Sequence, residues 1–307
     1  MKMTVALAAA LLALASPAKA TQIGVYAGPG CAGVEYLGVY KAWLGSPAMH
    51  VTENFNQNSW PELASGAGWS IECYAAVRNS INMTFSIPML PADGVSTLAK
   101  GAAGEYDHYF RDIANQLVKY GFQTTIVRLG WEFNGSWQPW FASNPTDYIS
   151  YFRRIVDLMK AVPGARFQFE WCPNIGPVNM PADQAYPGDQ YVDIIGMDIY
   201  DAHYGEGDAT PPDRWAFYVS EPFGLQWHVD FAKAHMKPLS FPEWGCCGNN
   251  AGDDPYFIDQ MALWQTTHSY LYSVYWDSNA AYRGQLSNNQ YPYASARYKA
   301  HFNRMPQ

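Results

Sequence analysis

The chain has little charge for its length and is short of positive charge in particular. Only 15% of its 307 residues are charged, and 19 Lys and Arg stand against 27 Asp and Glu, for a formal net charge of −8. An acidic surface repels nucleic acid phosphates and anionic lipid headgroups. We therefore expect neither a nucleic-acid partner nor a membrane partner.

Long apolar runs are also scarce, and the one present lies at the start. It follows Lys2, covers residues 5–15 and precedes a small-x-small cleavage motif over 18–20. This is the pattern of a signal peptide over residues 1–20, and the run is too short for a lasting membrane span. We expect a secreted or periplasmic mature protein, residues 21–307. Loss of the two signal lysines would bring its charge near −10.

Cysteines are few and carry no metal-site spacing. There is no Cys-x2-Cys pair and no closely spaced His pair, so we expect no metal and no cofactor. In an oxidising compartment some cysteines should be paired, and we favour Cys31 with Cys73. Cys246 and Cys247 could bond each other, or one of them could bond Cys172. The odd count leaves at least one thiol outside these pairs.

What the chain does contain is apolar and aromatic residues, at 49% and 16%. Several short segments read as continuous β-branched or aromatic runs, as buried parallel strands do. Eight such segments alternate with helical stretches, which predicts an α/β fold, a single-domain (β/α)8 TIM barrel over residues 21–307. The predicted strands are 23–27, 50–55, 81–88, 124–131, 166–172, 192–200, 239–243 and 272–276.

Helical periodicity is clear in four of the intervening stretches. Apolar residues recur at helical spacing over 106–120 and 146–159, and helices are also expected over 215–236 and 255–268. The stretches 28–47 and 56–80 show no such pattern and read as long loops that build part of a cleft. No linker, repeat or low-complexity segment is present, which favours one catalytic domain.

Two glutamates stand out, each at the end of a predicted strand and each beside tryptophan. Glu132 ends the fourth strand and Glu243 the seventh. Active sites of (β/α)8 barrels lie at the C-terminal ends of the strands. A buried carboxylate costs free energy unless it is paired, so two of them among aromatics suggest a sugar-binding cleft with an acid and a nucleophile. The alternative is two surface glutamates beside packing aromatics.

The segments around both glutamates resemble glycoside hydrolase family 26 of clan A, best known for β-mannanases. The likeness rests on Arg128 with the run Glu132-Phe133-Asn134-Gly135 and the tryptophans that follow, and on Glu243-Trp244-Gly245. Residues 192–200 and 275–277 resemble the family's sixth and eighth strands. The match in strand order covers nearly the whole mature chain.

This resemblance implies a secreted retaining endo-β-glycanase, in which Glu132 is the acid/base and Glu243 the nucleophile of a double displacement. Tyr200 takes the place of a tyrosine that supports the nucleophile. The chain departs from the family at Trp131, where characterised members usually have histidine. The implied substrate is β-1,4-mannan or a related β-linked polysaccharide.

The remaining site candidates are aromatic or polar residues near these strand ends. Aromatic faces stack on the apolar faces of pyranose rings, and amide or guanidinium groups bind hydroxyls or carboxylates. His203 and Tyr204, after the sixth strand, could also line the cleft, and Asn174 could reach the acid. The predicted substrate-binding residues are Trp131, Asn134, Trp137, Trp140, Tyr200, Trp276 and Arg128.

Other activities remain compatible with this pattern. The substrate could be a bacterial exopolysaccharide, a β-glucan or xylan, and an inactive barrel that only binds glycans is a further alternative. A lyase acting on uronic acids needs basic residues, which this acidic chain lacks as clusters; a transglycosylase stays open. We expect a monomer whose partner is a polysaccharide or oligosaccharide.

Overall fold

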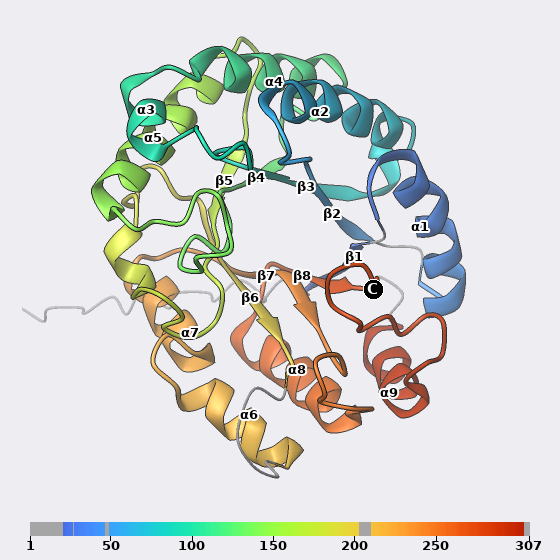
Figure 1. Ribbon diagram of the computed structural model, residues 1–307. Coiled ribbons are helices and arrows are strands. Elements are labelled where there is room, and N and C mark those ends of the chain that lie inside the picture. The colour runs from blue at the N-terminus through green and yellow to red at the C-terminus, as the bar shows by residue number, and fades with distance from the viewer. Residues whose placement is uncertain (1–20, 27, 47–48, 203–209, 304–307) are drawn as a thin grey trace, which may run out of the picture.

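The computed structural model describes residues 21–26, 28–46, 49–202 and 210–303, and within them the chain forms a closed parallel barrel. Each strand pairs with its neighbours in chain order, and β1 closes on β8 (Figure 1). The strands are β1 (Gln22–Tyr26), β2 (His50–Asn54), β3 (Asn82–Ile87), β4 (Ile126–Leu129), β5 (Gln168–Trp171), β6 (Ile194–Tyr200), β7 (Leu239–Gly245) and β8 (Tyr272–Trp276). The predicted (β/α)8 fold is therefore confirmed.

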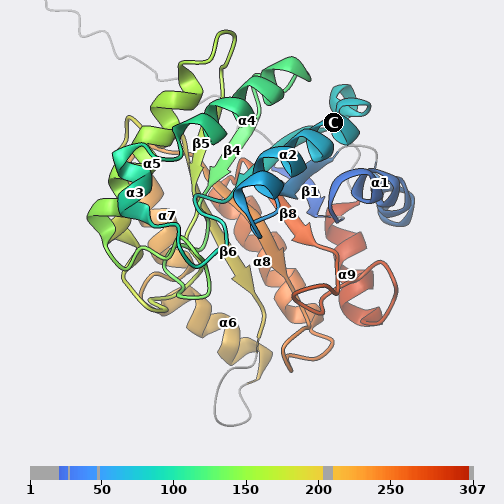
Figure 2. The ribbon, with the colours of Figure 1, turned by 45° about the horizontal axis from the view of Figure 1, so that its top comes forward.

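Helices surround the barrel on its outside, as Figures 1 and 2 show from two directions. They bury their apolar faces against strands that are themselves buried on both faces, as in β7. The α-helices are α1 (Gly30–Leu44), α2 (Trp60–Ala75), α3 (Leu98–Ala103), α4 (Asp107–Lys119), α5 (Pro145–Lys160), α6 (Pro211–Ser220), α7 (Leu225–Ala234), α8 (Pro255–His268) and α9 (Pro292–Phe302).

The prediction of long loops after the first two strands is wrong. The stretches 28–47 and 56–80 contain α1 and α2, whose glycines and small residues blur the helical period. One start signal was present in the sequence: the Ser59 side chain accepts a hydrogen bond from the Glu62 backbone N–H at 3.3 Å. A Ser followed three residues later by Glu is the pattern of a helix N-terminus.

The single helix expected over 215–236 is two helices. α6 ends at Ser220 and α7 begins at Leu225, with Pro222 and Gly224 between them. Proline cannot continue a helix without losing a hydrogen bond, and glycine weakens one. The break projects the connecting residues toward the carboxyl ends of the strands.

The disulfide expected between Cys31 and Cys73 is confirmed and joins α1 to α2. Cys246 and Cys247 are bonded to each other, which decides between the two alternatives for them. Cys172 is a free, buried thiol. The covalent link between α1 and α2 ties together the two helices that the sequence pattern did not reveal.

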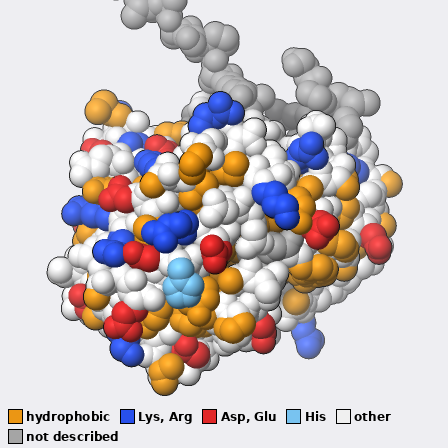
Figure 3. Space-filling view, turned by 90° about the horizontal axis from the view of Figure 1, so that it is seen from above, with side chains coloured by type: hydrophobic (Ala, Val, Ile, Leu, Met, Phe, Trp, Pro, Cys, Tyr) orange, Lys and Arg blue, Asp and Glu red, His pale blue; other side chains and the backbone are white. Residues whose placement is uncertain are grey.

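The described surface mixes charges of both signs. Figure 3 shows Lys and Arg interspersed with Asp and Glu on one face. Across the described ranges, no helix combines the length and apolar character needed to cross a membrane. The predicted signal peptide, His203 and Tyr204 lie outside the described residues.

Candidate active site

A cavity of about 1060 Å³ opens at the carboxyl ends of the strands, and both glutamates line it. Trp131, Trp137, Tyr200 and Trp276 also line it, so the structure brings together most of the predicted site residues. Glu132 and Glu243 come from β4 and β7, on different sides of the barrel. Their shared cavity excludes the alternative of two unrelated surface residues.

An irregularity in β7 positions Glu243. The register with β6 pairs Gly196 with Ser240 but Asp198 with Glu243, so β7 has one extra residue there. The register with β8 shifts at the same place, around Pro242. Proline donates no ladder hydrogen bond, and such bulges re-aim side chains next to active sites. The bulge turns Glu243 into the cavity.

Glu243 is buried and held by two donors. Arg128 Nη1 lies 3.2 Å from Glu243 Oε2, and the Tyr200 hydroxyl donates a short hydrogen bond to Oε1. Burial raises the pKa of Glu243 above its ordinary value, and the nearby charge of Glu132 raises it further, while Arg128 and Tyr200 oppose both. The Tyr200 hydrogen bond therefore lowers the pKa of Glu243 but does not outweigh the effect of burial.

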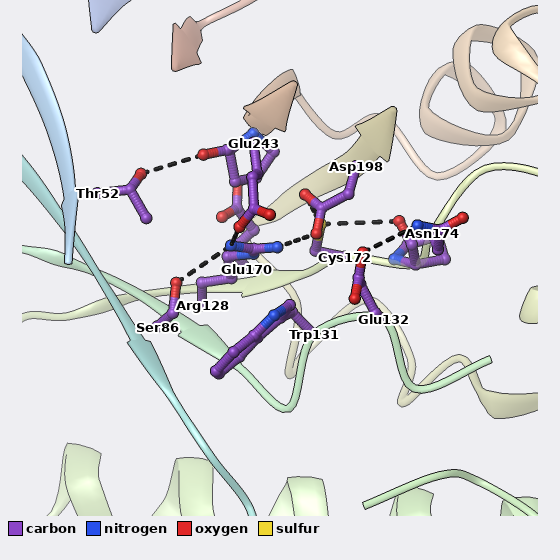
Figure 4. A network of polar contacts seen from close by, with 12 residues as sticks. Thr52, Ser86, Arg128, Trp131, Glu132, Glu170, Cys172, Asn174, Asp198 and Glu243 are labelled. Carbon is purple, nitrogen blue, oxygen red and sulfur yellow. Dashed lines mark hydrogen bonds and ion pairs between the residues drawn. The ribbon is translucent and has the colours of Figure 1, made fainter. Parts of the chain in front are cut away.

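Arg128 is the centre of the buried charge network drawn in Figure 4. Its side chain is fully buried and forms an ion pair with Asp198 besides that with Glu243. Ser86 accepts a further hydrogen bond at 3.2 Å, and the Trp131 ring lies 5.2 Å from the guanidinium carbon. Arg128 therefore has the other role expected of it, pairing with a catalytic carboxylate, and it does not line the cavity as a substrate-binding residue.

Glu132 lies three residues past the end of β4 and not at the strand end as predicted. Its backbone has a positive φ of 51°, and its N–H donates to the Cys172 carbonyl at 2.8 Å. A glutamate in this left-handed conformation is uncommon and such strain gathers at functional sites. The turn therefore presents the carboxylate to the cavity at the cost of local strain.

Three side chains orient the Glu132 carboxylate. Asn174 Nδ2 donates to Oε1 at 2.8 Å, as the sequence suggested, while Trp137 Nε1 and Gln138 Nε2 donate to Oε2 at 2.8 and 3.1 Å. None of these donors is charged. Glu243 has a buried cation beside it and Glu132 does not, so the two carboxylates occupy different environments.

The tryptophans divide between the cavity and the core. Trp137 is 53% exposed within the cavity lining, and Trp276 stacks on Tyr26 at 4.0 Å between ring centroids. The Trp276 indole N–H is buried without a partner among the described residues, as is Asn54 Oδ1, which also lines the cavity. Such unpaired polar atoms on an aromatic wall suit ligand hydroxyls.

Two predicted binding residues prove to be structural. Trp140 is fully buried and its indole N–H donates to the Trp131 carbonyl at 2.6 Å. The Asn134 amide bonds the backbone of Asn174 and Gly176. Neither lines the cavity, because Asn134 joins the segments after β4 and β5 and Trp140 supports the backbone of Trp131 within the first of them. The prediction that they contact sugar is wrong.

The cavity lining is acidic and includes residues that the sequence did not indicate. Glu221 and Phe217 come from the end of α6, and no Lys, Arg or His is among the described lining residues. No described group of three His, Cys, Asp or Glu is placed to hold a metal ion. The arrangement can supply carboxylates and aromatic faces to a neutral ligand.

Comparison with known proteins shows which family the segment around Glu132 resembles. The model of glycosyl hydrolase family 26 matches residues 98–211, a range that includes Glu132. The chain is also 33% identical over 107 residues to Endoglucanase H of Acetivibrio thermocellus. That match covers 32% of this chain and 12% of the length of Endoglucanase H.

Solved structures share the fold of this chain. It superposes on the Bacillus subtilis mannanase man26 with a TM-score of 0.61 at 16% identity, covering 93% of this chain and 86% of that one. A modular endo-β-1,4-mannanase from Cellulomonas fimi gives a TM-score of 0.62 at 19% identity, covering 85% and 66%. At these identities the likeness establishes the barrel architecture.

Proposed function

We propose that this protein is a glycoside hydrolase that cleaves a β-linked polysaccharide by a retaining mechanism. The observation that carries the proposal is the pair of carboxylates in one cavity, with Glu243 held by Arg128 and Tyr200 and Glu132 held by neutral donors. The match of residues 98–211 to glycosyl hydrolase family 26 supports the same reading. Two carboxylates in different environments are what acid and nucleophile roles require.

In this mechanism Glu132 donates its proton to the departing glycosidic oxygen. Its contacts with Trp137, Gln138 and Asn174 orient the carboxyl group without a permanent positive charge beside it. Absence of a fixed cation suits a group that must bind and release a proton during each turnover.

Glu243 attacks the anomeric carbon and forms a covalent glycosyl-enzyme. Arg128 stabilises the ionised carboxylate through Oε2, and Tyr200 fixes its orientation through Oε1. Water then releases the sugar, with Glu132 acting as base. The anomeric configuration is retained because two inversions occur.

The substrate that we propose is β-1,4-mannan or a related β-linked glycan. Two solved structures of the same fold are named mannanases, and the relative by sequence is named an endoglucanase. Trp131 lines the cavity at the position next to Glu132 and brings an indole where an imidazole is usual in the family. We also propose export, on the basis of the apolar amino-terminal segment.

The acid role of Glu132 is tested by its dependence on the leaving group. Glu132→Ala should lose nearly all hydrolysis of polysaccharide, whose leaving oxygen needs a proton, and keep turnover of aryl glycosides with acidic phenol leaving groups. The exposed Glu105→Ala serves as the matched control. Full activity of Glu132→Ala on polysaccharide would contradict the assignment.

A further inference from the structure

One part of the cavity wall lies outside the set of residues that the mechanism uses. It consists of Val178, Phe217 and Glu221, which come from the loop after β5 and from the carboxyl end of α6. We refer to these three residues as the α6 subsite. No sequence pattern indicated this subsite, because the end of α6 reaches the cavity only through the fold.

Glu221 is a half-buried carboxylate with no partner among the described residues. It is the C-cap residue of α6, and its side chain packs over the backbone of Gly176 and Gly224. Burial raises the pKa of Glu221 to about 7, and no described donor or cation opposes this. A carboxylate at a helix C-terminus is also unfavourable to the helix, so Glu221 contributes nothing evident to stability.

Apolar surface beside this carboxylate is exposed. Phe217 is 59% exposed and Val178 41%, although both line a concave cavity. Large apolar side chains left open in a cavity indicate ligand contact. An aromatic ring next to an unpaired carboxylate fits a sugar, which has an apolar face and hydroxyls at its edge.

A chain of contacts places the α6 subsite on the Glu132 side of the cavity. Asn174 donates to Glu132, and two residues later a Cβ built on Gly176 would lie 2.8 Å from Glu221 Oε2. The backbone of Gly176 is fixed there by its N–H, which donates to the Phe223 carbonyl at 3.0 Å. A group that protonates the leaving oxygen faces the leaving half of the substrate.

We propose that the α6 subsite binds a sugar unit of the leaving group, with the pyranose face on Phe217 and two neighbouring hydroxyls donating to Glu221. This inference rests on the proposed function, since it takes Glu132 as the proton donor. The ligand is a neutral sugar, because hydroxyl donors satisfy both carboxylate oxygens. The subsite makes the enzyme prefer substrates with several units beyond the cleaved bond.

The test compares substrates that reach the α6 subsite with one that does not. Wild type, Glu221→Gln and Phe217→Ala are assayed on manno-oligosaccharides of three to six units and on an aryl β-mannoside, which has no leaving-group sugar. We expect the ratio of kcat/KM for the longest oligosaccharide to that for the aryl mannoside to fall about tenfold in each variant, or about 1.4 kcal/mol. Glu105→Gln should leave the ratio unchanged.

The same ratio in wild type and both variants would overturn the proposal. If wild type cleaves neither substrate, the mannan form of the proposed function fails, and binding of mannohexaose is measured by calorimetry instead. A tenfold weaker affinity of Glu221→Gln then supports the subsite, and equal affinity overturns it. Tighter binding of glucosamine oligosaccharides than of neutral ones would overturn the hydroxyl assignment.

Discussion

Arg128 should be the most consequential single residue for stability in the barrel interior. Its side chain and that of Asp198 are fully buried, and Asp198 pairs in register with Glu243 on the neighbouring strand. Replacing Arg128 by Met leaves these two carboxylates side by side without a cation. Breaking a buried ion pair in this way costs about 3–5 kcal/mol.

A loss of that size is a large fraction of a typical unfolding free energy of about 5–15 kcal/mol. The matched control is Arg154→Met, which removes an ion pair with Asp107 at the surface, where the Arg154 side chain is 39% exposed. Exposed pairs contribute about 0–1 kcal/mol. Both variants remove an ion pair of arginine with aspartate, so the difference between their free energies of unfolding measures the effect of burying that pair.

The assay is urea denaturation of wild type, of Arg128→Met, Arg154→Met and Asp198→Asn, and of the double variant that combines Arg128→Met with Asp198→Asn. Asp198→Asn removes one of the two carboxylates that Arg128→Met leaves without a cation. The effects of the two substitutions on the free energy of unfolding should therefore depart from additivity by about 1–3 kcal/mol. Arg128→Met as stable as Arg154→Met, or a double variant that recovers nothing, would refute the reasoning.

Two further predictions concern the donors and acids around this network. Tyr200→Phe removes a hydrogen bond to the charged form of Glu243 and should lower kcat/KM by about ten- to a hundredfold and the free energy of unfolding by about 1–3 kcal/mol, so unchanged kcat/KM would contradict the role. Burial raises the pKa of Glu170 from 4.5 to about 7, against hydrogen bonds from neighbouring hydroxyls. The folded state thus holds this proton more tightly than the unfolded state, and the free energy of unfolding should fall as pH rises from about 4.5 to 7. Urea midpoints at pH 5 and pH 8 check this, and Glu170→Gln should show a smaller difference than wild type; an equal difference would exclude Glu170 as a source.

The barrel was predictable because its strands are buried on both faces. Segments rich in β-branched and aromatic residues, such as 192–200 and 272–276, are typical of such strands. α1 and α2 escaped prediction because their small residues give little contrast between faces, although Ser59 and Glu62 marked one start.

The two glutamates were predictable as a pair because the carboxyl ends of all strands in a (β/α)8 barrel lie at the same face. The roles of their neighbours were not, since Trp137 and Trp140 look alike in sequence but one is exposed and the other fully buried. The position of Glu221 in the cavity lining could not be predicted from the sequence, because it depends on where the fold places the end of α6.

The central claim is that Glu243 carries glycoside hydrolysis in this cavity. Its most direct test is release of reducing ends from mannan, glucomannan, mixed-linkage glucan and xylan by wild type and Glu243→Ala side by side. We predict that wild type cleaves at least one of these glycans and that Glu243→Ala loses this activity while remaining folded. A folded Glu243→Ala variant that matches the wild-type rate would contradict the account, as would a wild type that binds these glycans and never cleaves them.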